Sequence, residues 1–469
     1  MQLPSLIGHV QELLGAILAS HLQGETQLRT PVKPADSLID TFFRSRKYLG
    51  SHDRRFIAET AYGTLRHLRR SQTILQSALT AAHQSVNDED SLLLTIAAYL
   101  VHIERREDIT ASVIEQKLNE PHLKDSIPFL LKQFAETNHL PATDDAERLG
   151  VEYSYPDWMA KKLIAQHGAQ EAQKMMASLN EQAPLTLRVN TLKAEVEACQ
   201  AALKKEGIET TRTPLSPVGL NVAKRFNIFG LTAFREGMFE VQDEGSQLLP
   251  LLIDPKPTAK VLDACAGAGG KTLALAAIMK NRGEIFATDV HDGRLEELRK
   301  RSKRAGVSNV RVKVISSVDD LTRAEEAEAS RVGDFNGYFD VVLIDAPCTG
   351  LGTIRRNPGM KWSVTEDTVR ELSEKQSAIL AQSAPLVKPG GRLVYATCTM
   401  LREENEDVVE GFLSKHTEFS VADISASLEK MKLSSALNGK YIRLQPHVHG
   451  TDGFFCAVME KQNEVLSSK

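Results

Sequence analysis

Two cysteines follow predicted buried strands, and both are placed to act as nucleophiles. Cys348 comes shortly after Asp345, which ends the apolar run 339–344, and Cys398 directly follows the apolar run 392–397. The carboxyl ends of neighbouring parallel strands lie at one edge of a sheet. We therefore expect the two thiols and the carboxylate of Asp345 to lie close together.

A loop of small residues follows an earlier predicted strand, 260–263, and opens a helix. Its residues are Cys265, Ala266, Gly267, Ala268, Gly269, Gly270 and Lys271. Small side chains let a ligand approach the backbone, and a helix N-terminus offers free N–H groups. A P-loop needs glycine where Cys265 stands, and the glycine spacing does not fit a dinucleotide fingerprint. This favours a loop that holds the methionine part of S-adenosylmethionine (SAM).

Asp289 ends the next predicted strand, 284–290. A carboxylate at this place can accept both hydroxyl protons of a ribose, in a SAM enzyme or in an NAD enzyme. It could equally cap the helix that follows. We interpret Asp289 as part of the cofactor site because it accompanies the small-residue loop.

A thiol beside a methyl donor suits covalent methylation of cytosine. Carbon 5 of cytosine is too poor a nucleophile to take a methyl group directly. A thiolate that adds to carbon 6 makes the ring an enamine, and carbon 5 then attacks the methyl sulfonium; proton loss and thiolate elimination release the product. A thiol of pKa about 8.5 is mostly protonated at neutral pH, so such a site must favour its thiolate. Asp345 would hold the polar edge of the pyrimidine.

The elements around these residues predict three domains. From residue 241 to 463, apolar β-branched runs alternate with amphipathic helices, which indicates an α/β, doubly wound, Rossmann-like domain with a mostly parallel sheet. Residues 1–145 show helical periodicity almost throughout and predict an all-α domain. Residues 150–240 combine a strand at 185–189, a helix at 194–205 and further short strands, and predict a small α+β module.

Composition limits the class of protein. The 469 residues carry a net charge of −4 and five cysteines, with no CxxC pair, so neither a disulfide framework nor a metal site is indicated. Cys199 and Cys456 lie in ordinary apolar or amphipathic surroundings, and we interpret both as packing residues. No signal peptide and no membrane span of roughly 20 apolar residues is evident. We expect a cytoplasmic monomer that does not bind membranes.

Any binding of nucleic acid must rest on local basic patches, because the chain as a whole is slightly acidic. Three patches are present, at 44–70, at 294–304, and at Arg355, Arg356 and Lys361. Each patch alone is more often a solvated helix face than a phosphate contact.

Several further motifs accompany the loops, and together they are highly specific. They are Tyr153 to Trp158, Leu187 to Leu192, Val241 to Ser246, Glu403 to Glu406 and Gly450 to Phe455. With them, most of the chain resembles the RsmB/Sun/Fmu family of SAM-dependent RNA cytosine-C5 methyltransferases. The resemblance implies that Cys398 is the nucleophile and that Cys348 assists release of the methylated base. Because DNA cytosine methyltransferases place their nucleophile in the motif of Cys348, the presence of both cysteines implies RNA as substrate.

The resemblance also interprets the front of the chain. Residues 1–145 would be a NusB-like RNA-binding domain and residues 150–240 an RRM-like module. The expected partner is ribosomal RNA, with the 16S RNA of the small subunit as the family-weighted substrate. The candidate RNA contacts are Arg54, Arg66, Arg188, Arg355 and Arg356.

Two departures from the family pattern concern the cofactor. The first loop has Gly267 and Ala268 where the family has Ala and Pro, which predicts a less rigid loop. After the third strand the family commonly has an aspartate that meets the adenine; here Ser316 and Ser317 stand there and Asp319 comes slightly later. We therefore assign no adenine contact.

Two other functions stay open. One is a ribosome-assembly factor that binds SAM and RNA without catalysis, which only the altered first loop supports. The other is a nicotinamide-dependent oxidoreductase, which Asp289 alone would also fit.

Overall fold

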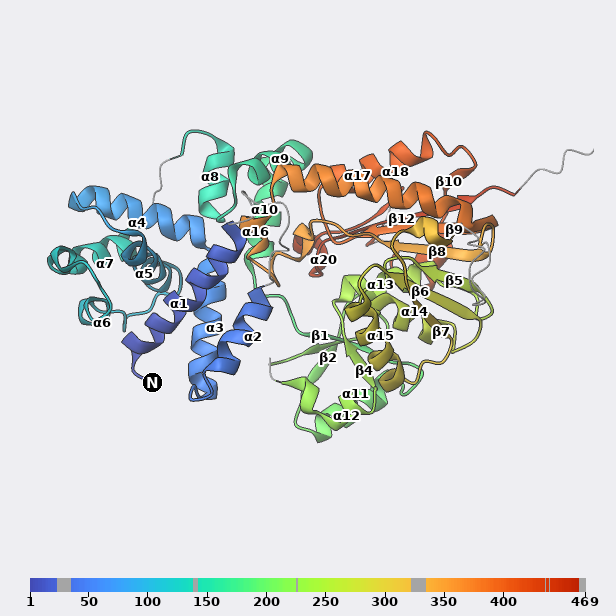
Figure 1. Cartoon of the computed structure of the whole chain (residues 1–469), viewed down its shortest axis with the longest axis horizontal. Coiled ribbons are helices and arrows are strands. Elements are labelled where there is room, and N and C mark those ends of the chain that lie inside the picture. Colours follow the sequence, from blue (N-terminus) through green and yellow to red (C-terminus); the bar gives the residue numbers. More distant parts are fainter. Residues whose placement is uncertain are drawn as a thin grey trace, which may run out of the picture. The chain divides into compact units, whose positions relative to one another are not determined.

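The structure is a computed structural model that describes residues 1–22, 35–137, 142–224, 227–321, 335–434, 436–437 and 439–463 (Figure 1). The chain forms two compact units. Unit 1 combines Met1–Gln182 with Ile354–Thr365, and unit 2 combines Ala183–Thr353 with Glu366–Lys469. The chain therefore passes from unit 1 to unit 2 and returns once.

Unit 1 is helical throughout its described residues. Its α-helices are α1 (Leu3–Leu22), α2 (Ala35–Ser45), α3 (Ser51–Arg66), α4 (Leu68–Ala82), α5 (Asp88–Ala98), α6 (Ala111–Glu115), α7 (Ile127–Glu136), α8 (Asp145–Glu152), α9 (Asp157–His167), α10 (Ala169–Asn180) and α16 (Met360–Ser363). Apolar side chains at helical spacing, such as Val10, Leu14 and Ile17, are buried in one shared core. The prediction of an all-α domain at the front of the chain is confirmed.

Helix α1 is strongly apolar and also packs in the core of unit 1. Over Leu3–Ser20 it is the one helix, among the described residues, that is long and apolar enough by composition to cross a membrane. Its side chains at Ile7, Leu13 and Ile17 are nevertheless buried in the core of unit 1. This face of α1 is thus part of a helical core.

The short segment Ile354–Thr365 is held in unit 1 by Lys361. The Lys361 side chain is fully buried, and its Nζ donates to the carbonyl oxygens of Arg66 (3.0 Å) and Tyr153 (3.2 Å) and to Oδ1 of Asn180 (2.5 Å). Burial, and then the charge of Arg66, lowers the pKa of Lys361 well below its ordinary value. Next to it, Trp362 Nε1 donates to the carbonyl oxygen of Leu65 at 2.9 Å.

The first sheet of unit 2 is small and antiparallel. Its strands are β1 (Thr186–Val189), β2 (Thr210–Arg212), β3 (Gly219–Val222) and β4 (Phe239–Val241), in the order β2-β3-β1-β4. Helices α11 (Val196–Lys205) and α12 (Thr232–Arg235) belong to the same region, and Leu187, Leu203 and Phe239 share its core. The predicted strand at 185–189 and the predicted helix at 194–205 are thus present. Helices α8 to α10 lie in unit 1, so the boundary predicted at 145–150 does not coincide with a boundary between the units.

The second sheet has eight strands and carries the predicted motifs. They are β5 (Lys260–Asp263), β6 (Glu284–Asp289), β7 (Val310–Val314), β8 (Phe339–Asp345), β9 (Val387–Thr397), β10 (Phe419–Val421), β11 (Ile442–Leu444) and β12 (Phe454–Lys461). Their order is β10-β12-β9-β8-β5-β6-β7, with β11 paired to β12. Strands β5 to β9 run parallel to their neighbours, and β12 is antiparallel to β9. The predicted doubly wound α/β domain is confirmed.

Helices cover both faces of this sheet (Figure 1). The helices are α13 (Glu244–Ile253), α14 (Gly270–Ile278), α15 (Asp292–Ala305), α17 (Glu366–Ser383), α18 (Glu406–Leu413), α19 (Ser425–Lys430) and α20 (Pro446–His449). Side chains alternate between the faces: Leu343 and Val394 pack with residues of α13 and α14, whereas Ile344 packs with residues of α17 and α18. The unbroken apolar runs in the sequence arise because both faces are buried.

Replacing Lys361 by methionine should destabilise unit 1. The buried acceptors at Arg66, Tyr153 and Asn180 would lose their shared donor, at a cost of about 2–4 kcal/mol in free energy of unfolding. Urea unfolding followed by circular dichroism measures this cost. Lys132→Met removes an exposed lysine of unit 1 and should change stability by less than about 0.5 kcal/mol. Equal stability of the two variants would contradict this role of Lys361.

Candidate active site

The two predicted cysteines meet at the edge of the second sheet. Strands β8 and β9 are parallel neighbours with Asp345 opposite Ala396, so the loops that follow them leave the sheet side by side. The sulfur atoms of Cys348 and Cys398 are 3.5 Å apart, within hydrogen-bonding distance for sulfur. The structure therefore brings together the two thiols that the strand pattern placed at this edge.

The two thiols differ in their surroundings. The hydrogen bond with Cys398, together with burial, raises the pKa of Cys348 well above its ordinary value. Cys348 therefore keeps its proton, and its S–H can donate to the sulfur of Cys398. Outside this site, Cys199 and Cys456 are buried, and burial raises their pKa to about 11 and about 12. Both pack as ordinary core residues, as predicted.

Asp345 forms an ion pair with Lys271 beside the thiols. Lys271 Nζ lies 2.6 Å from Asp345 Oδ2, with 9% of the lysine side chain and 34% of the aspartate side chain exposed. Burial would lower the pKa of Lys271, but the carboxylate of Asp345 outweighs burial and raises it; Cys398 adds a smaller effect in the same direction. The lysine, which we predicted to be part of the cofactor loop, therefore stays charged and directs its ammonium group at Asp345.

Asp263, at the end of β5, is a buried carboxyl that the sequence did not single out. Its Oδ2 accepts a hydrogen bond from Thr272 Oγ1 at 2.6 Å. Burial is the largest cause of its raised pKa, which is about 7. Its position directly before the small-residue loop was visible in the sequence, but a strand-end aspartate there also fits an ordinary helix cap.

The small-residue loop is tightly curled and is pinned at several points. Gly267 (φ 54°) and Gly269 (φ 85°) both adopt left-handed backbone conformations, and a side chain at Gly269 would collide with Leu298. Gly267 N donates to Asp289 Oδ2 at 3.0 Å, and Arg301 Nη1 donates to the carbonyl oxygen of Ala268 at 2.8 Å. Glycine at 267 suits the conformation that this loop adopts.

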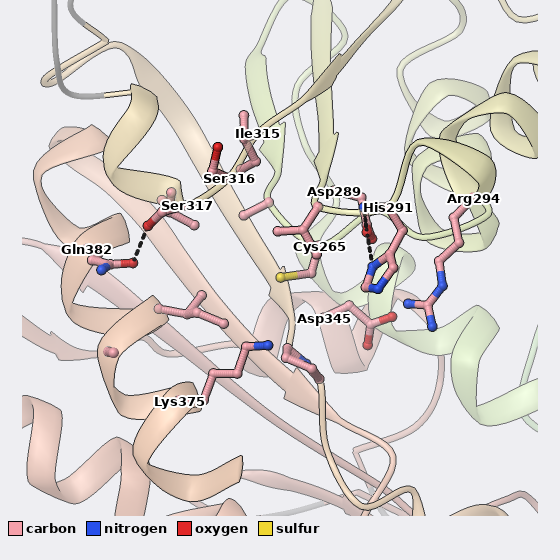
Figure 2. Close-up of a pocket in the computed structure, with 16 residues that line it drawn as sticks. Cys265, Asp289, His291, Arg294, Ile315, Ser316, Ser317, Asp345, Lys375 and Gln382 are labelled. Atoms are coloured by element: carbon pink, nitrogen blue, oxygen red, sulfur yellow. Dashed lines mark hydrogen bonds and ion pairs between the residues drawn. The ribbon is translucent and has the colours of Figure 1, made fainter. Parts of the chain in front are cut away.

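A cavity of about 310 Å³ lies at the start of this loop, beside Cys265 (Figure 2). Its lining contains Cys265, Asp289 and Asp345, three of the predicted cofactor residues. The remaining loop residues, Ala266, Gly267, Ala268, Gly269, Gly270 and Lys271, are not among the residues that line it. Asp289 also accepts hydrogen bonds from the backbone N–H of His291, so one carboxylate supports the loop and faces the cavity.

The far side of the cavity involves residues that sequence reasoning missed. Ser316 and Ser317 line it after β7, and Lys375 and Gln382 line it from α17. Figure 2 shows Ser317 beside Gln382; Ser317 Oγ donates to Gln382 Oε1 at 3.3 Å. Only the topology brings α17 to this place, because nothing in its amphipathic pattern distinguishes cavity-facing residues from other exposed ones. Asp319 binds Gln382 Nε2 but is not part of the lining.

The expectation that Arg188 contacts RNA is not supported by the structure. Arg188 is buried, and its Nη1 donates to Gln242 Oε1 (2.7 Å) and to the carbonyl oxygen of Gly270 (2.6 Å). The arginine thus holds the first residue of α14 by a hydrogen bond. In the sequence, a lone arginine in a short strand looks the same whether it binds RNA or is buried against other residues. The prediction was wrong for this reason.

The other predicted RNA contacts lie in unit 1. Arg355 is buried, and its carbonyl oxygen accepts a hydrogen bond from Arg66 Nη2 at 3.2 Å. Burial makes Arg355 a poor phosphate contact in this conformation. Arg54 is half-buried and donates to the carbonyl oxygen of Leu49, and Arg356 is also half-buried. Among the described residues, no group of three or more His, Cys, Asp or Glu is arranged to hold a metal ion.

Comparisons with known proteins bear on this arrangement. The family model described as "16S rRNA methyltransferase RsmB/F" matches residues 250–460, and one described as an RsmF/B-like, ferredoxin-like domain matches residues 155–229. A curated relative from Bacillus subtilis (strain 168), "Probable ribosomal RNA small subunit methyltransferase B", is 36% identical over 68% of this chain and 69% of its own length. The chain belongs to the RsmB/F family of methyltransferases.

Solved structures agree with membership of the RsmB/F family. PH0851, of known crystal structure, superposes with a TM-score of 0.72 at 28% identity, over 96% of this chain and 99% of its own. A methyltransferase homolog from Pyrococcus horikoshii has a TM-score of 0.56 at 30% identity, over 68% of this chain and 100% of its own. The resemblance stated from the motifs is confirmed, and so is SAM as the cofactor. The cavity, the curled glycine loop and the carboxylate of Asp289 fit that cofactor.

Asp289→Ala should weaken SAM binding at least about tenfold, or 1.4 kcal/mol. The variant loses the carboxylate that faces the cavity and also frees Gly267 N from its partner. Isothermal titration with SAM in the absence of RNA measures the affinity. Asp292→Ala, at the exposed start of α15, is the matched control and should leave the affinity unchanged. Wild-type affinity in Asp289→Ala would remove Asp289 from the cofactor site.

Proposed function

We propose that the chain transfers a methyl group from SAM to carbon 5 of a cytosine in 16S ribosomal RNA. The observation that carries this proposal is the pair of thiols 3.5 Å apart, next to the Lys271–Asp345 ion pair and the cavity. The substrate class follows from the curated relatives, whose names specify ribosomal RNA of the small subunit. A cytoplasmic location and a monomeric state accompany the proposal.

The hydrogen bond between the thiols supports Cys398 as the nucleophile. The S–H of Cys348 lies 3.5 Å from the Cys398 sulfur, where it can stabilise a thiolate at Cys398. The Cys398 sulfur then adds to carbon 6 of the cytosine, and electrons move to carbon 5 and nitrogen 3. When bound, SAM supplies the methyl cation equivalent that carbon 5 takes up.

Asp345 and Lys271 act on the ring rather than on the methyl group. Asp345 is partly exposed, so its second oxygen can face the pyrimidine edge while Oδ2 stays on Lys271. The pair keeps the carboxylate in place to accept a hydrogen bond from the exocyclic amino group of the cytosine, and Lys271 supplies positive charge near the ring on which negative charge develops.

Release of the product requires the carbon 5 proton to leave and the bond between carbon 6 and the Cys398 sulfur to break. The departing sulfur becomes a thiolate again, and the S–H of Cys348 is placed to stabilise it by a hydrogen bond. This is why we assign Cys348 to release of the methylated base.

Cys398→Ala should lower methyl transfer to 16S RNA at least about 1,000-fold, as loss of a covalent nucleophile does. Cys348→Ala should instead accumulate an RNA adduct that survives denaturant, because the adduct forms but does not resolve. Transfer of labelled methyl groups and denaturing gels measure the two effects. Cys456→Ala, which removes a thiol of the sheet core, is the control. Full turnover in Cys398→Ala would overturn the assignment.

Bisulfite sequencing tests the substrate. In 16S RNA from cells that lack the gene, one cytosine that is methylated in the parent should be fully converted, and the purified chain with SAM should restore its protection. The Cys398→Ala variant should not restore it. An unchanged 16S pattern, with a changed pattern in another RNA, would move the substrate out of the small subunit.

A further inference from the structure

Two adjacent side chains, Glu404 and Asn405, form hydrogen bonds to the loops that carry the two cysteines. They belong to the motif 403–406, to which the reaction above gives no role. Glu404 ends a short 3-10 helix, Arg402–Glu404, and Asn405 precedes α18. Both residues are almost completely buried.

Asn405 holds the loop of Cys398 on both sides of the cysteine. Its Oδ1 accepts a hydrogen bond from Thr397 Oγ1 at 2.6 Å, and its Nδ2 donates to the carbonyl oxygen of Thr399 at 3.2 Å. The side-chain amide of Asn405 thus pairs with one donor and one acceptor at the same time. The residues before and after Cys398 are fixed by one side chain.

Glu404 holds the loop of Cys348. Its Oε1 accepts from the backbone N–H of Thr349 at 2.8 Å, and its Oε2 accepts from Thr349 Oγ1 at 2.5 Å. Gln376 of α17 donates from Nε2 to Glu404 Oε1 (3.0 Å) and to the carbonyl oxygen of Pro347 (2.9 Å). The residues on both sides of Cys348 are therefore tied to this carboxylate.

Two direct contacts join these two loops to each other. Thr349 Oγ1 and Thr399 Oγ1 are 3.0 Å apart, and Gly352 N donates to the carbonyl oxygen of Cys398 at 2.9 Å. Tyr395 donates from its hydroxyl to the carbonyl oxygen of Glu404 at 2.6 Å, which anchors the motif to β9. The network thus connects the loop of Cys348 to the loop of Cys398.

The buried carboxylate of Glu404 is costly for stability alone. In the described part of the chain its hydrogen-bond donors are a backbone amide, a hydroxyl and a side-chain amide, all of them neutral. Burial of an acidic side chain is costly even when its oxygen atoms accept hydrogen bonds, and an apolar residue could fill such a place. A site that must hold two sulfur atoms at a fixed distance gains activity from such a residue that outweighs its cost in stability. A misplacement of about 1 Å can lower a rate about 100-fold.

We propose that Glu404 and Asn405 are positioning residues that set the distance between the sulfur atoms of Cys348 and Cys398. The inference deepens the proposed function and rests on it for the catalytic meaning of that distance. Their hydrogen bonds go to Thr349, Gln376, Thr397 and Thr399, so both residues act through the loops.

The distance between the thiols can be tested apart from methyl transfer. Diamide takes two electrons and two protons from two thiols and leaves a disulfide, and only neighbouring thiols react quickly. The rate at which Cys348 and Cys398 become linked, followed by peptide mass mapping, thus reports their proximity. The variants are Glu404→Gln, Asn405→Ala and the conservative Asn405→Asp, with Asp407→Asn as the matched control, since Asp407 is exposed at the start of α18.

We expect the first two variants to form the disulfide at least about fivefold more slowly and to lose about 10–100-fold in kcat. The affinity for SAM should stay within about twofold of the wild type, because the cavity residues are untouched. Asn405→Asp keeps the acceptor for Thr397 and loses the donor to Thr399, so it should fall in between. Asp407→Asn should match the wild type in every measurement.

Two results would overturn the inference. One is disulfide formation at the wild-type rate in Glu404→Gln and Asn405→Asp, the variants most certain to fold. The other is a loss of SAM affinity that parallels the loss of kcat, which would indicate general damage to the domain. If the wild-type chain methylates no RNA but the disulfide rates still respond, the positioning role stands and the proposed function fails.

Discussion

The half-buried ion pair between Lys271 and Asp345 connects the two halves of the site. Lys271 ends the small-residue loop and lies in the first turn of α14, and Asp345 ends β8 directly before the loop of Cys348. The pair thereby ties the cofactor loop to the cysteine loop across neighbouring parallel strands. A charge pair of this kind contributes less to stability than to geometry, because Lys271 is almost completely removed from water. Its position beside Cys398 also places a positive charge where the proposed mechanism needs a thiolate.

Two acidic groups at this edge have raised pKa values for different reasons. Burial raises the pKa of Asp263 to about 7, and the hydrogen bond with Cys398, together with burial, raises the pKa of Cys348 well above its ordinary value. A carboxyl whose folded-state pKa is raised costs stability once it ionises, so Asp263 destabilises the fold as the pH rises through about 7. This edge of the sheet therefore holds two groups, Asp263 and Cys348, that keep their protons to a higher pH than usual.

Strand ends were predictable, and side-chain partners were not. The unbroken apolar runs before Asp345 and Cys398 predicted buried parallel strands. Because such strands end at one edge of the sheet, this pattern alone placed the two cysteines together. The partner of Lys271 depends on how α14 is oriented over the sheet, which no local pattern encodes. Gln382 and Ser317 meet only because α17 packs against the segment that follows β7. Arg188 shows the reverse failure, since its charge suggested a surface whereas its two buried acceptors required it inside.

The return of Ile354–Thr365 to unit 1 has a consequence for how the chain is made. The acceptors of Lys361 belong to residues 66, 153 and 180, and the ribosome delivers Lys361 itself about 180 residues after the last of them. At about 5–20 residues per second, helices α1 to α10 wait about ten seconds or more for their last buried donor. Strands β5 to β8 emerge during that wait, and β9 and β12 emerge after it. Nascent units 1 and 2 are thus both incomplete at the same time, and the apolar cores of both stay partly uncovered during that interval.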